Sequence, residues 1–333
     1  MIKFTILNSL HKIAVLTSGG DSPGMNAAIR AVVRASVYNN IECVGIYRGY
    51  QGLIEGDFIS LNARSVKNII NRGGTMLKSA RSKKFRTKEG RKKAFENLKR
   101  ENVDALVVIG GDGTFTGAHI FNNEFNFPIV GLPGTIDNDI IGTDYTIGYD
   151  TALNTVVEAI DKIRDTANSH NRLFLIEVMG RNAGDIALSA GIGAGAEAII
   201  IPEQDLGKDY LVQSLRKSKK SGKSSSIVVV SEGDEIGKNI FQVAHYIEEN
   251  LKEYEVRVTV LGHIQRGGTP SCYDRVLASK LGVAAIDALL DGKKDCMIGT
   301  RNRKIVSVPF LETIQGKNEI DKDLLRVAEI VSI

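Results

Sequence analysis

The segment Pro133-Gly134-Thr135-Ile136-Asp137-Asn138-Asp139 holds the side chains with the clearest capacity for chemistry. It places a hydroxyl and two carboxylates directly after the apolar run Pro128 to Leu132. In open parallel sheets, ligands bind beyond the carboxyl ends of the strands, so Asp137 and Asp139 are expected to face a substrate. Two carboxylates at i and i+2 can divide the roles of general base and orienting group. On its own, the same sequence is also compatible with a solvated acidic turn.

Two glycine-rich turns follow other apolar runs in the same way. Gly110-Gly111-Asp112-Gly113-Thr114 comes after Ala105 to Ile109, and Thr17 to Gly24 comes after Lys12 to Leu16. Glycine permits close backbone approach, and the start of a helix offers amides and a dipole that hold phosphate oxygens. Asp112 would repel a polyphosphate unless a divalent cation lay between them, which makes it a candidate Mg²⁺ ligand; a structural turn is the alternative. Two such turns predict a nucleotide site.

Cationic side chains gather near glycines and strand ends. Several arginines placed in this way can clamp a phosphate group bidentately, whereas a lone surface arginine is usually solvated. Glu232 closes the apolar run Ile227 to Val230 and is a candidate for binding a sugar hydroxyl. The cationic candidates are Arg72, Arg81, Arg172, Arg181, Arg257, His263 and Arg266.

Two apparent nucleotide motifs fail on their context. Gly222-Lys223-Ser224 resembles the end of a P-loop, but Lys217 stands where the first glycine should be. Gly191 to Ala196 fits GxGxxA, yet it trails a helical pattern and precedes an apolar run, the reverse of the dinucleotide-binding order. Tight packing and contact with a small ligand both remain open for this second segment.

The elements that must position these groups alternate along the chain. Apolar β-branched runs followed by helical patterns predict an α/β protein with buried parallel sheets. Ser22 or Asp21, before Pro23, is expected to cap the first helix. The expected strands are 12–16, 43–47, 105–109, 129–132, 173–178, 198–201, 227–230 and 257–261, and the expected helices are 24–38, 87–100, 149–168, 209–219, 240–251 and 273–290.

Length and composition favour two domains of a cytosolic protein. The chain has 333 residues, of which 43% are hydrophobic and 25% charged. No apolar run approaches the ~18 residues that a membrane span requires, and Met1 to Leu10 is interpreted as a short extension without a signal-peptide cleavage site. The 3 cysteines are widely spaced and form no CxxC pair, which argues against a zinc site and for a reducing compartment.

The net charge of +4 is too small to indicate a nucleic-acid partner by itself. The segment Lys78 to Arg100 is strongly basic, and a solvated helix face is the simplest interpretation. Because it contains few aromatic residues on which bases could stack, a phosphorylated small molecule is favoured over a polynucleotide as its anionic partner.

Four motifs occur in order along the chain: IGGDGT at 109–114, PGTIDND at 133–139, MGR at 179–181 and GHIQRGG at 262–268. Together they resemble the bacterial ATP-dependent 6-phosphofructokinase family. The resemblance runs from about Lys12 to about Leu290. GGDGT alone is weak, because NAD kinases and lipid kinases share it, but those enzymes have no use for the arginine and histidine set of a sugar-phosphate pocket.

The resemblance implies transfer of the ATP γ-phosphoryl group to the 1-hydroxyl of fructose 6-phosphate, with release of ADP, in the committed step of glycolysis. The implied fold has two Rossmann-like αβα lobes with largely parallel sheets and an active-site cleft between them. Residues 1–147 plus 264–314 would form the ATP-binding lobe, and residues 148–263 plus 315–333 the fructose 6-phosphate-binding lobe. A cytoplasmic homotetramer is the family expectation.

The resemblance also implies a role for each matching residue. Asp137 would be the general base, with Thr135, Asp139, Arg181 and Arg81 as the other catalytic residues, and Asp112 would hold Mg²⁺. The ATP-binding set would be Gly20, Arg81, Ser82, Gly111, Asp112, Gly113 and Thr114. The fructose 6-phosphate set would be Thr135, Ile136, Asp137, Arg172, Met179, Gly180, Arg181, Glu232, Arg257, His263, Ile264, Gln265 and Arg266, with Arg172 and Arg257 supplied by a neighbouring subunit.

The phosphoryl donor follows from two glycines. Pyrophosphate-dependent relatives carry an aspartate at the position of Gly113 and a lysine at the position of Gly134. The aspartate would crowd a nucleotide and the lysine would fill space near the donor, so the two glycines favour ATP. A pyrophosphate-dependent enzyme and a non-catalytic nucleotide or sugar-phosphate sensor are the alternatives.

An effector site for ADP or phosphoenolpyruvate is also implied, on residues Arg30, Arg34, Arg164, Glu197 and Lys223. Two positions depart from the family pattern, because Ala63 stands where an arginine is expected and Ser221 replaces a lysine. Losing cationic side chains weakens the binding of an anion. We therefore expect reduced or altered activation by ADP.

Overall fold

A computed structural model describes residues 10–170, 172–204, 206–220, 226–316 and 319–331. Internal contacts divide the chain into two compact units. As far as its residues are described, unit 1 is Met1–Ile136, Ile140–Asp150 and Arg266–Lys317, and unit 2 is Asp137–Asp139, Thr151–Gln265 and Asn318–Ile333. The short segment Asp137–Asp139 therefore groups with unit 2, whereas the sequence expectation had placed it in the first lobe.

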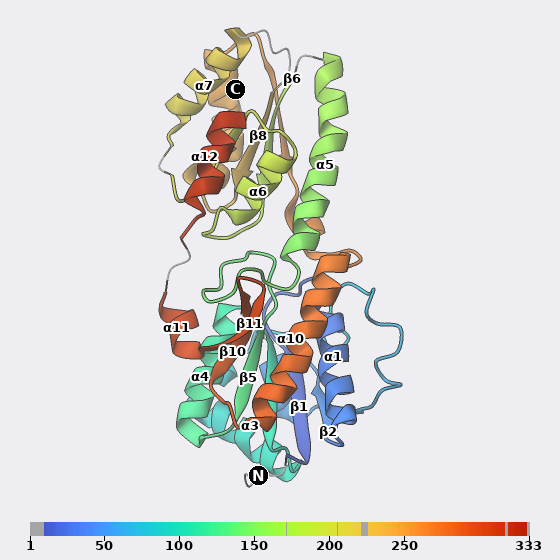
Figure 1. The fold of residues 1–333 in the computed structure, drawn as a ribbon. Helices are drawn as coiled ribbons and strands as arrows, with labels where there is room; N and C mark the ends of the chain where they lie inside the picture. Colours follow the sequence, from blue (N-terminus) through green and yellow to red (C-terminus); the bar gives the residue numbers. More distant parts are fainter. Residues whose placement is uncertain (1–9, 171, 205, 221–225, 317–318, 332–333) are drawn as a thin grey trace. The chain divides into compact units, whose positions relative to one another are not determined.

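Unit 1 contains a seven-stranded sheet with the order β11-β10-β5-β4-β1-β2-β3 (Figure 1). The pairs from β10 to β2 are parallel, and the two edge strands β11 and β3 are antiparallel to their neighbours. In the register of the sheet, Ile109 lies opposite both Thr17 and Leu132, so these three strands end at the same edge. The strands are β1 Lys12–Thr17, β2 Glu42–Ile46, β3 Phe58–Leu61, β4 Ala105–Gly110, β5 Ile129–Pro133, β10 Cys296–Arg301 and β11 Lys304–Pro309.

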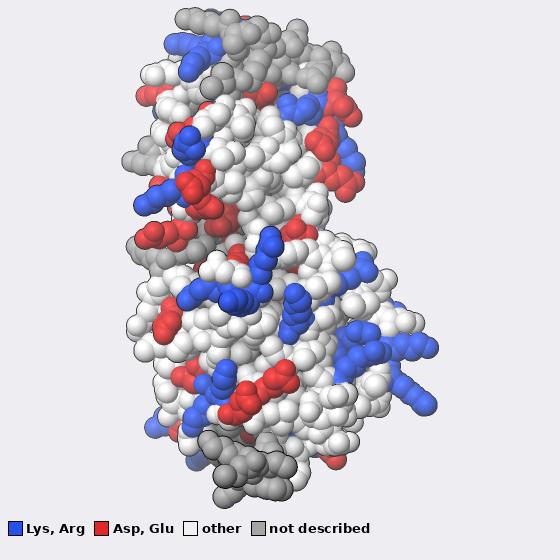
Figure 2. All heavy atoms as spheres, in the orientation of Figure 1, with Lys and Arg blue, Asp and Glu red and all other residues white. Residues whose placement is uncertain are grey.

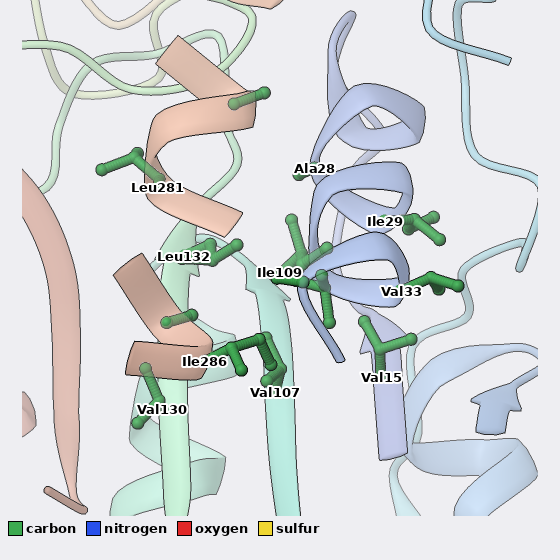
Figure 3. Close-up of a cluster of buried hydrophobic side chains, with 14 of the residues drawn as sticks. Val15, Ala28, Ile29, Val33, Val107, Ile109, Val130, Leu132, Leu281 and Ile286 are labelled. Atoms are coloured by element: carbon green, nitrogen blue, oxygen red, sulfur yellow. The ribbon is translucent and has the colours of Figure 1, made fainter. Parts of the chain in front are cut away.

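Helices cover both faces of this sheet. On one face, α1 and α10 pack over β1, β4 and β5, with Ile29, Val107 and Ile286 fully buried between them (Figure 3). Burying a side chain of this size contributes roughly 1.5–3 kcal/mol, which is why these strands read as unbroken apolar runs. A second cluster, containing Phe115 and Phe310, fills the other face. The helices are α1 Met25–Tyr38, α2 Gly49–Glu55, the 3₁₀ turn η1 Lys84–Arg86, α3 Lys88–Arg100, α4 Asp112–Phe125, α10 Cys272–Leu290 and α11 Phe310–Gln315.

Unit 2 is built on a smaller sheet of four strands, all parallel, in the order β7-β8-β6-β9. Leu175, Val228 and Ile247 belong to its buried core. The strands are β6 Arg172–Val178, β7 Ala198–Ile200, β8 Ser226–Ser231 and β9 Glu255–Val260. The helices are α5 Tyr149–His170, α6 Asp185–Gly193, α7 Lys208–Lys220, α8 Glu235–Lys238, α9 Ile240–Asn250, the 3₁₀ turn η2 Gly262–Arg266, and α12 Lys322–Val331.

The prediction of an α/β fold with largely parallel sheets is confirmed, and each of the eight expected strands is present within one or two residues at its ends. The predicted cap of α1 is wrong. The capping residue is Gly24, at φ 107°, and Ser22 instead donates its hydroxyl hydrogen bond to the carbonyl of Ile147. In the part of the chain that the structure describes, no helix is long and apolar enough to cross a membrane.

The GxGxxA segment is a packing feature. It spans the end of α6 and the turn before β7, and a Cβ added at Gly191 would lie 2.7 Å from two atoms of Ile199. Glycine is required there because the helix end and the strand approach closely. The rejected P-loop candidate at 222–224 lies outside the described residues.

Candidate active site

The predicted phosphate-binding turns of unit 1 are tied together at one edge of the sheet. The backbone N–H of Ser18 donates to the carbonyl of Ile109 over 3.0 Å, and that of Gly134 donates to the carbonyl of Gly110 over 3.0 Å. The hydroxyl of Thr114 donates to the carbonyl of Ser18 over 3.2 Å. The ends of β1, β4 and β5 therefore hold their three loops in one fixed arrangement.

Helix α4 begins within the GGDGT turn. Its N-cap is Gly111, which has no side chain that could compete with a ligand for the first amides of the helix. A Cβ added at Gly113 would meet nothing within 4 Å among the described residues. The described residues therefore leave room for a side chain at 113, and the argument that a larger residue there would intrude on a nucleotide stays a prediction.

Packing also favours a small residue at Gly134. A Cβ added there would lie 3.0 Å from Cγ2 of Ile109 and 3.2 Å from Cε of Met25, both fully buried, so these neighbours would have to shift by a few tenths of an ångström. The argument that this glycine favours ATP as the phosphoryl donor stays a prediction.

Gly20 accommodates Arg266. A Cβ at position 20 would lie 2.5 Å from Nη1 of Arg266, which itself donates to the carbonyl of Asp21 over 3.3 Å. The first glycine turn therefore brings a guanidinium group into the predicted phosphate region. The absence of a side chain at Gly20 is what allows that approach.

Two further cationic candidates of unit 1 lie on its surface. Arg72 and Arg81 are exposed, and Ser82 donates its hydroxyl hydrogen bond to the side chain of Gln51 over 2.8 Å. Figure 2 shows Lys and Arg side chains gathered over the segment between β3 and η1, which contains both arginines. This positive surface belongs to unit 1 alone.

In unit 2, Arg181 joins the two carboxylates of the acidic segment. The carboxylate of Asp137 has no exposed surface, and its Oδ2 lies 3.1 Å from Nε of Arg181. Oδ2 of Asp139 lies 4.0 Å from Nη1 of the same guanidinium. A buried carboxylate, a second carboxylate and a half-exposed arginine are thus within one small volume, which is the arrangement expected of a general base beside a group that stabilises negative charge.

The backbone of Arg181 is held as firmly as its side chain. It adopts φ 54°, in the left-handed region, and its N–H donates to Oε1 of Glu232 over 3.0 Å. A Cβ added at Gly233 would lie 1.6 Å from the carbonyl oxygen of Arg181, so only glycine fits there. The turns after β6 and β8 therefore pack tightly against each other, and this packing limits the positions that the guanidinium group can take.

Arg172 and Arg257 share a partner that was not predicted from the sequence. Nε of Arg172 donates to Oε2 of Glu255 over 2.9 Å, and Arg257 also forms an ion pair with the carboxylate of Glu255. Parallel pairing of β6 and β9 places Arg172 opposite Glu255. The i, i+2 spacing of Glu255 and Arg257 on one strand face was the available signal.

Other residues that are predicted to bind the sugar phosphate differ in their exposure. Ile264 is exposed, whereas Gln265 is completely buried. Gln265 accepts a hydrogen bond from the N–H of Met179 over 3.2 Å and donates to the carbonyl of Gly262 over 3.0 Å. Its amide therefore positions the Met179 turn. Gly180, at φ 141°, sits in that turn in a conformation that side chains rarely adopt.

Burial and like charges perturb two further acids of unit 2. Burial, together with the negative charge of Glu232, raises the pKa of Glu177. Burial, the charge of Glu203 and that of Asp139 raise the pKa of Asp185 to about 6. Neither residue was singled out from the sequence.

The predicted effector residues are distributed over both units. In unit 1, burial and the neighbouring Arg34 lower the pKa of Arg30 on α1. In unit 2, Arg164 donates to the carbonyls of Ala194 and Gly195 over 2.6 and 2.7 Å and lies 3.6 Å from Glu197. Lys223 and Ser221 lie outside the described residues.

Asp112 fits the predicted magnesium ion in its chemistry. It is the first residue of α4 and is exposed. The described residues contain no cluster of three or more His, Cys, Asp or Glu side chains that would enclose a metal by themselves. A single carboxylate suits Mg²⁺, which usually keeps several waters and is held by one or two carboxylates together with substrate phosphates.

Glycine turns at the carboxyl ends of parallel strands in unit 1, and a buried carboxylate paired with an arginine in unit 2, are features of α/β proteins that bind phosphorylated ligands. The family model described as Phosphofructokinase matches residues 12–289, and the chain belongs to the phosphofructokinase family. It is 54% identical to ATP-dependent 6-phosphofructokinase 2 of Bacteroides thetaiotaomicron, over 98% of this chain and 100% of that protein. It is 52% identical to ATP-dependent 6-phosphofructokinase of Brevibacillus brevis, over 97% and 100% of the two chains.

Solved structures agree with this membership. Phosphofructokinase from Saccharomyces cerevisiae superposes with a TM-score of 0.86 at 36% identity, covering 97% of this chain and 47% of the yeast chain. The pyrophosphate-dependent phosphofructokinase of Nitrosospira multiformis gives a TM-score of 0.85 at 21% identity, covering 98% and 92% of the two chains. The second likeness concerns the fold alone. The resemblance inferred from the four sequence motifs is confirmed.

Proposed function

We propose that the chain transfers the γ-phosphoryl group of ATP to the 1-hydroxyl of fructose 6-phosphate, giving fructose 1,6-bisphosphate and ADP. The observation that carries the proposal is the buried carboxylate of Asp137, 3.1 Å from the guanidinium of Arg181. Family membership, and relatives more than half identical that are named ATP-dependent 6-phosphofructokinases, support the substrates.

Asp137 is the general base in this proposal. Its carboxylate takes the proton of the sugar 1-hydroxyl as that oxygen attacks phosphorus. Arg181 supplies positive charge where the transferring group arrives, since phosphoryl transfer depends mainly on positioning and on stabilising charge. Thr135 and Asp139 orient the reacting groups, and Arg81 approaches the transferring phosphoryl group.

The donor site belongs to the glycine turns. Gly20 and Gly111 to Thr114 give ATP close access to the backbone, with Arg81 and Ser82 beside it. Asp112 would hold Mg²⁺, which supplies charge neutralisation between the donor phosphates when bound. The open space at Gly113 supports a nucleotide donor.

The acceptor site takes the sugar phosphate through cations. Arg172, Arg257, His263 and Arg266 bind the 6-phosphate, and Arg172 and Arg257 do so from a neighbouring subunit of a homotetramer. Met179, Gly180 and Glu232 contact the sugar, and Ile136, Ile264 and Gln265 complete the walls of the site. A cytoplasmic location and control by ADP or phosphoenolpyruvate, through Arg30, Arg34, Arg164, Glu197 and Lys223, follow from the same family.

A donor comparison tests this function. Purified enzyme is assayed with fructose 6-phosphate and Mg²⁺, with either ATP or pyrophosphate as the phosphoryl donor. We expect turnover with ATP and little with pyrophosphate. Turnover only with pyrophosphate would assign the chain to the alternative enzyme, and binding of both substrates without turnover would make it a sensor.

A further inference from the structure

One carboxylate beside the acidic segment has no role in the reaction as proposed above. Asp185 is the first residue of α6, and its side chain is half-buried. The side-chain amide of Asn138, which lies between Asp137 and Asp139, donates a hydrogen bond to it. The segment that carries both carboxylates is therefore attached to α6 through this contact.

Asn138 is well suited to that contact. Its backbone has φ 53°, in the left-handed region, which Gly, Asn and Asp adopt more readily than other residues. Of these three, only Asn has a side chain that can donate a hydrogen bond to a carboxylate at neutral pH. The residue type at 138 thus satisfies both the backbone and the partner.

The start of α6 gives Asp185 a fixed position. The N–H of Gly184 donates to Oε1 of Glu203 over 2.8 Å. A Cβ added at Gly184 would lie 2.6 Å from Oε2 of Glu203 and 2.5 Å from Cβ of Ile201. The helix start is therefore packed tightly against the chain that follows β7.

Asp185 keeps a charge in surroundings that disfavour one. Burial raises its pKa most, the charges of Glu203 and Asp139 add to this, and the hydrogen bonds from Asn138 and from its own backbone N–H oppose it, with a resulting pKa of about 6. At neutral pH the carboxylate is mostly ionised, at a cost in stability. Such perturbed groups concentrate at functional sites.

We propose that Asp185 is a positioning residue for phosphoryl transfer, which acts through Asn138 to fix the segment that carries Asp137 and Asp139. The assignment rests on the proposed function, because only a reaction at Asp137 gives the placement of this segment a kinetic consequence. Arg181 holds the same segment by its carboxylates, and Asp185 holds it by the residue between them.

A double-mutant cycle tests the contact. Asp185→Ala removes the acceptor, and Asn138→Gly removes the donor while still permitting φ 53°. We expect each variant to lower kcat about 10- to 100-fold, since small misplacements of reacting groups have effects of this size, with KM for ATP within about threefold. The double variant should lose little more than either single variant, because both remove one interaction. Additive losses would show that the two residues act separately and would overturn the proposal.

Asp185→Asn separates positioning from a structural role. An acid whose pKa is raised in the folded state destabilises the protein increasingly as pH rises from its unfolded pKa of about 4 through its folded pKa. Asparagine removes this cost, so we expect a higher Tm at about pH 7–8 together with a kcat several-fold lower. Asparagine also resembles the protonated carboxyl. As pH is lowered through about 6, the kcat of this variant should therefore fall less steeply than that of the wild type. A residue with only a structural role would show the same rise in Tm but would leave kcat and its pH profile unchanged.

The outcomes distinguish the two levels of inference. Glu158→Gln, an exposed residue of α5, is the control and should match the wild type. If the wild type turns over ATP and fructose 6-phosphate but the Asp185 and Asn138 variants stay within twofold in kcat, the positioning role is overturned alone. If the wild type shows no turnover, the proposed function falls and the positioning role with it. Should Asp185→Ala fail to fold, Asp185→Asn still gives a decisive result.

Discussion

Asp137 is completely buried, yet it is an acid in a segment that the sequence would equally allow as a surface turn. Burying a carboxylate is unfavourable unless it is paired, and Arg181 provides the pairing. A residue that served only a turn would gain nothing from this arrangement. The burial itself therefore favours a chemical role for Asp137.

The first prediction concerns this residue. Asp137→Ser should lower kcat by about 10²- to 10⁴-fold, the usual contribution of a general base, while KM for both substrates changes little. Steady-state kinetics with ATP and fructose 6-phosphate measure both values. Asp161→Ser, at an exposed position on α5, is the matched control. Turnover close to the wild-type value would remove Asp137 from the mechanism.

Glu255 supports a second prediction. It holds Arg172 and Arg257 together, and long arginine side chains lose conformational freedom when they are ordered for binding. Glu255→Ala should therefore raise KM for fructose 6-phosphate roughly tenfold and leave kcat within about threefold. Glu253→Ala, also exposed and two residues earlier, should have no such effect. An unchanged KM would show that the carboxylate does not orient the arginines.

The site residues that could be predicted lie in distinctive sequence motifs, and those that were missed have no distinctive sequence around them. Asp137 and Arg181 were found because PGTIDND and MGR are distinctive. Glu255 and Asp185 were missed because their importance lies in contacts across 83 and 47 residues of chain, to Arg172 and Asn138. Only the folded chain shows those contacts.

Among the elements, the turns after β6 and β8 give the sharpest test. A Cβ at Gly233 would lie 1.6 Å from the carbonyl oxygen of Arg181, whereas a Cβ at Gly207 meets nothing within 4 Å. Gly233→Ala must displace the Arg181 turn, so we expect a loss of about 1–3 kcal/mol in unfolding free energy together with a lower kcat. Gly207→Ala should change neither by a measurable amount. Thermal unfolding and steady-state kinetics measure both quantities for the two variants. Equal stability and equal kcat in the two variants would contradict the packing argument.

Two of the three missed strands differ from the predicted ones in their burial. Strands such as β4 are buried along their whole length and appear in the sequence as continuous apolar runs. The edge strands β3 and β11 are partly or largely exposed, so they have no such run. β10 is buried at five of its six positions, but its sequence CMIGTR ends in a glycine and two polar residues, so it also lacks a continuous apolar run.

At the scale of the whole molecule, the chain returns to unit 1 after completing most of unit 2. The family resemblance implied discontinuous lobes of this kind, with residues 264–314 added to residues 1–147. The grouping of Asp137–Asp139 with unit 2 did not follow from the sequence, because these residues are contiguous with β5 and its loop, which belong to unit 1. Within unit 2, Arg181 of the turn after β6 forms ion pairs with both Asp137 and Asp139.

The last prediction concerns regulation of the assembled enzyme. Ala63 is exposed at a position where the family resemblance leads us to expect an effector-binding arginine. An anionic effector such as ADP loses a charge-assisted partner there, so activation should be weaker than in relatives that carry the arginine. Rate is measured against ADP concentration at low fructose 6-phosphate for the wild type and for Ala63→Arg. We expect the substitution to lower the ADP concentration for half-maximal activation several-fold, with kcat at saturating substrate unchanged. Ser60→Arg, at an exposed position three residues earlier, controls for added charge, and an equal response from both variants would show that position 63 has no specific role in binding the effector.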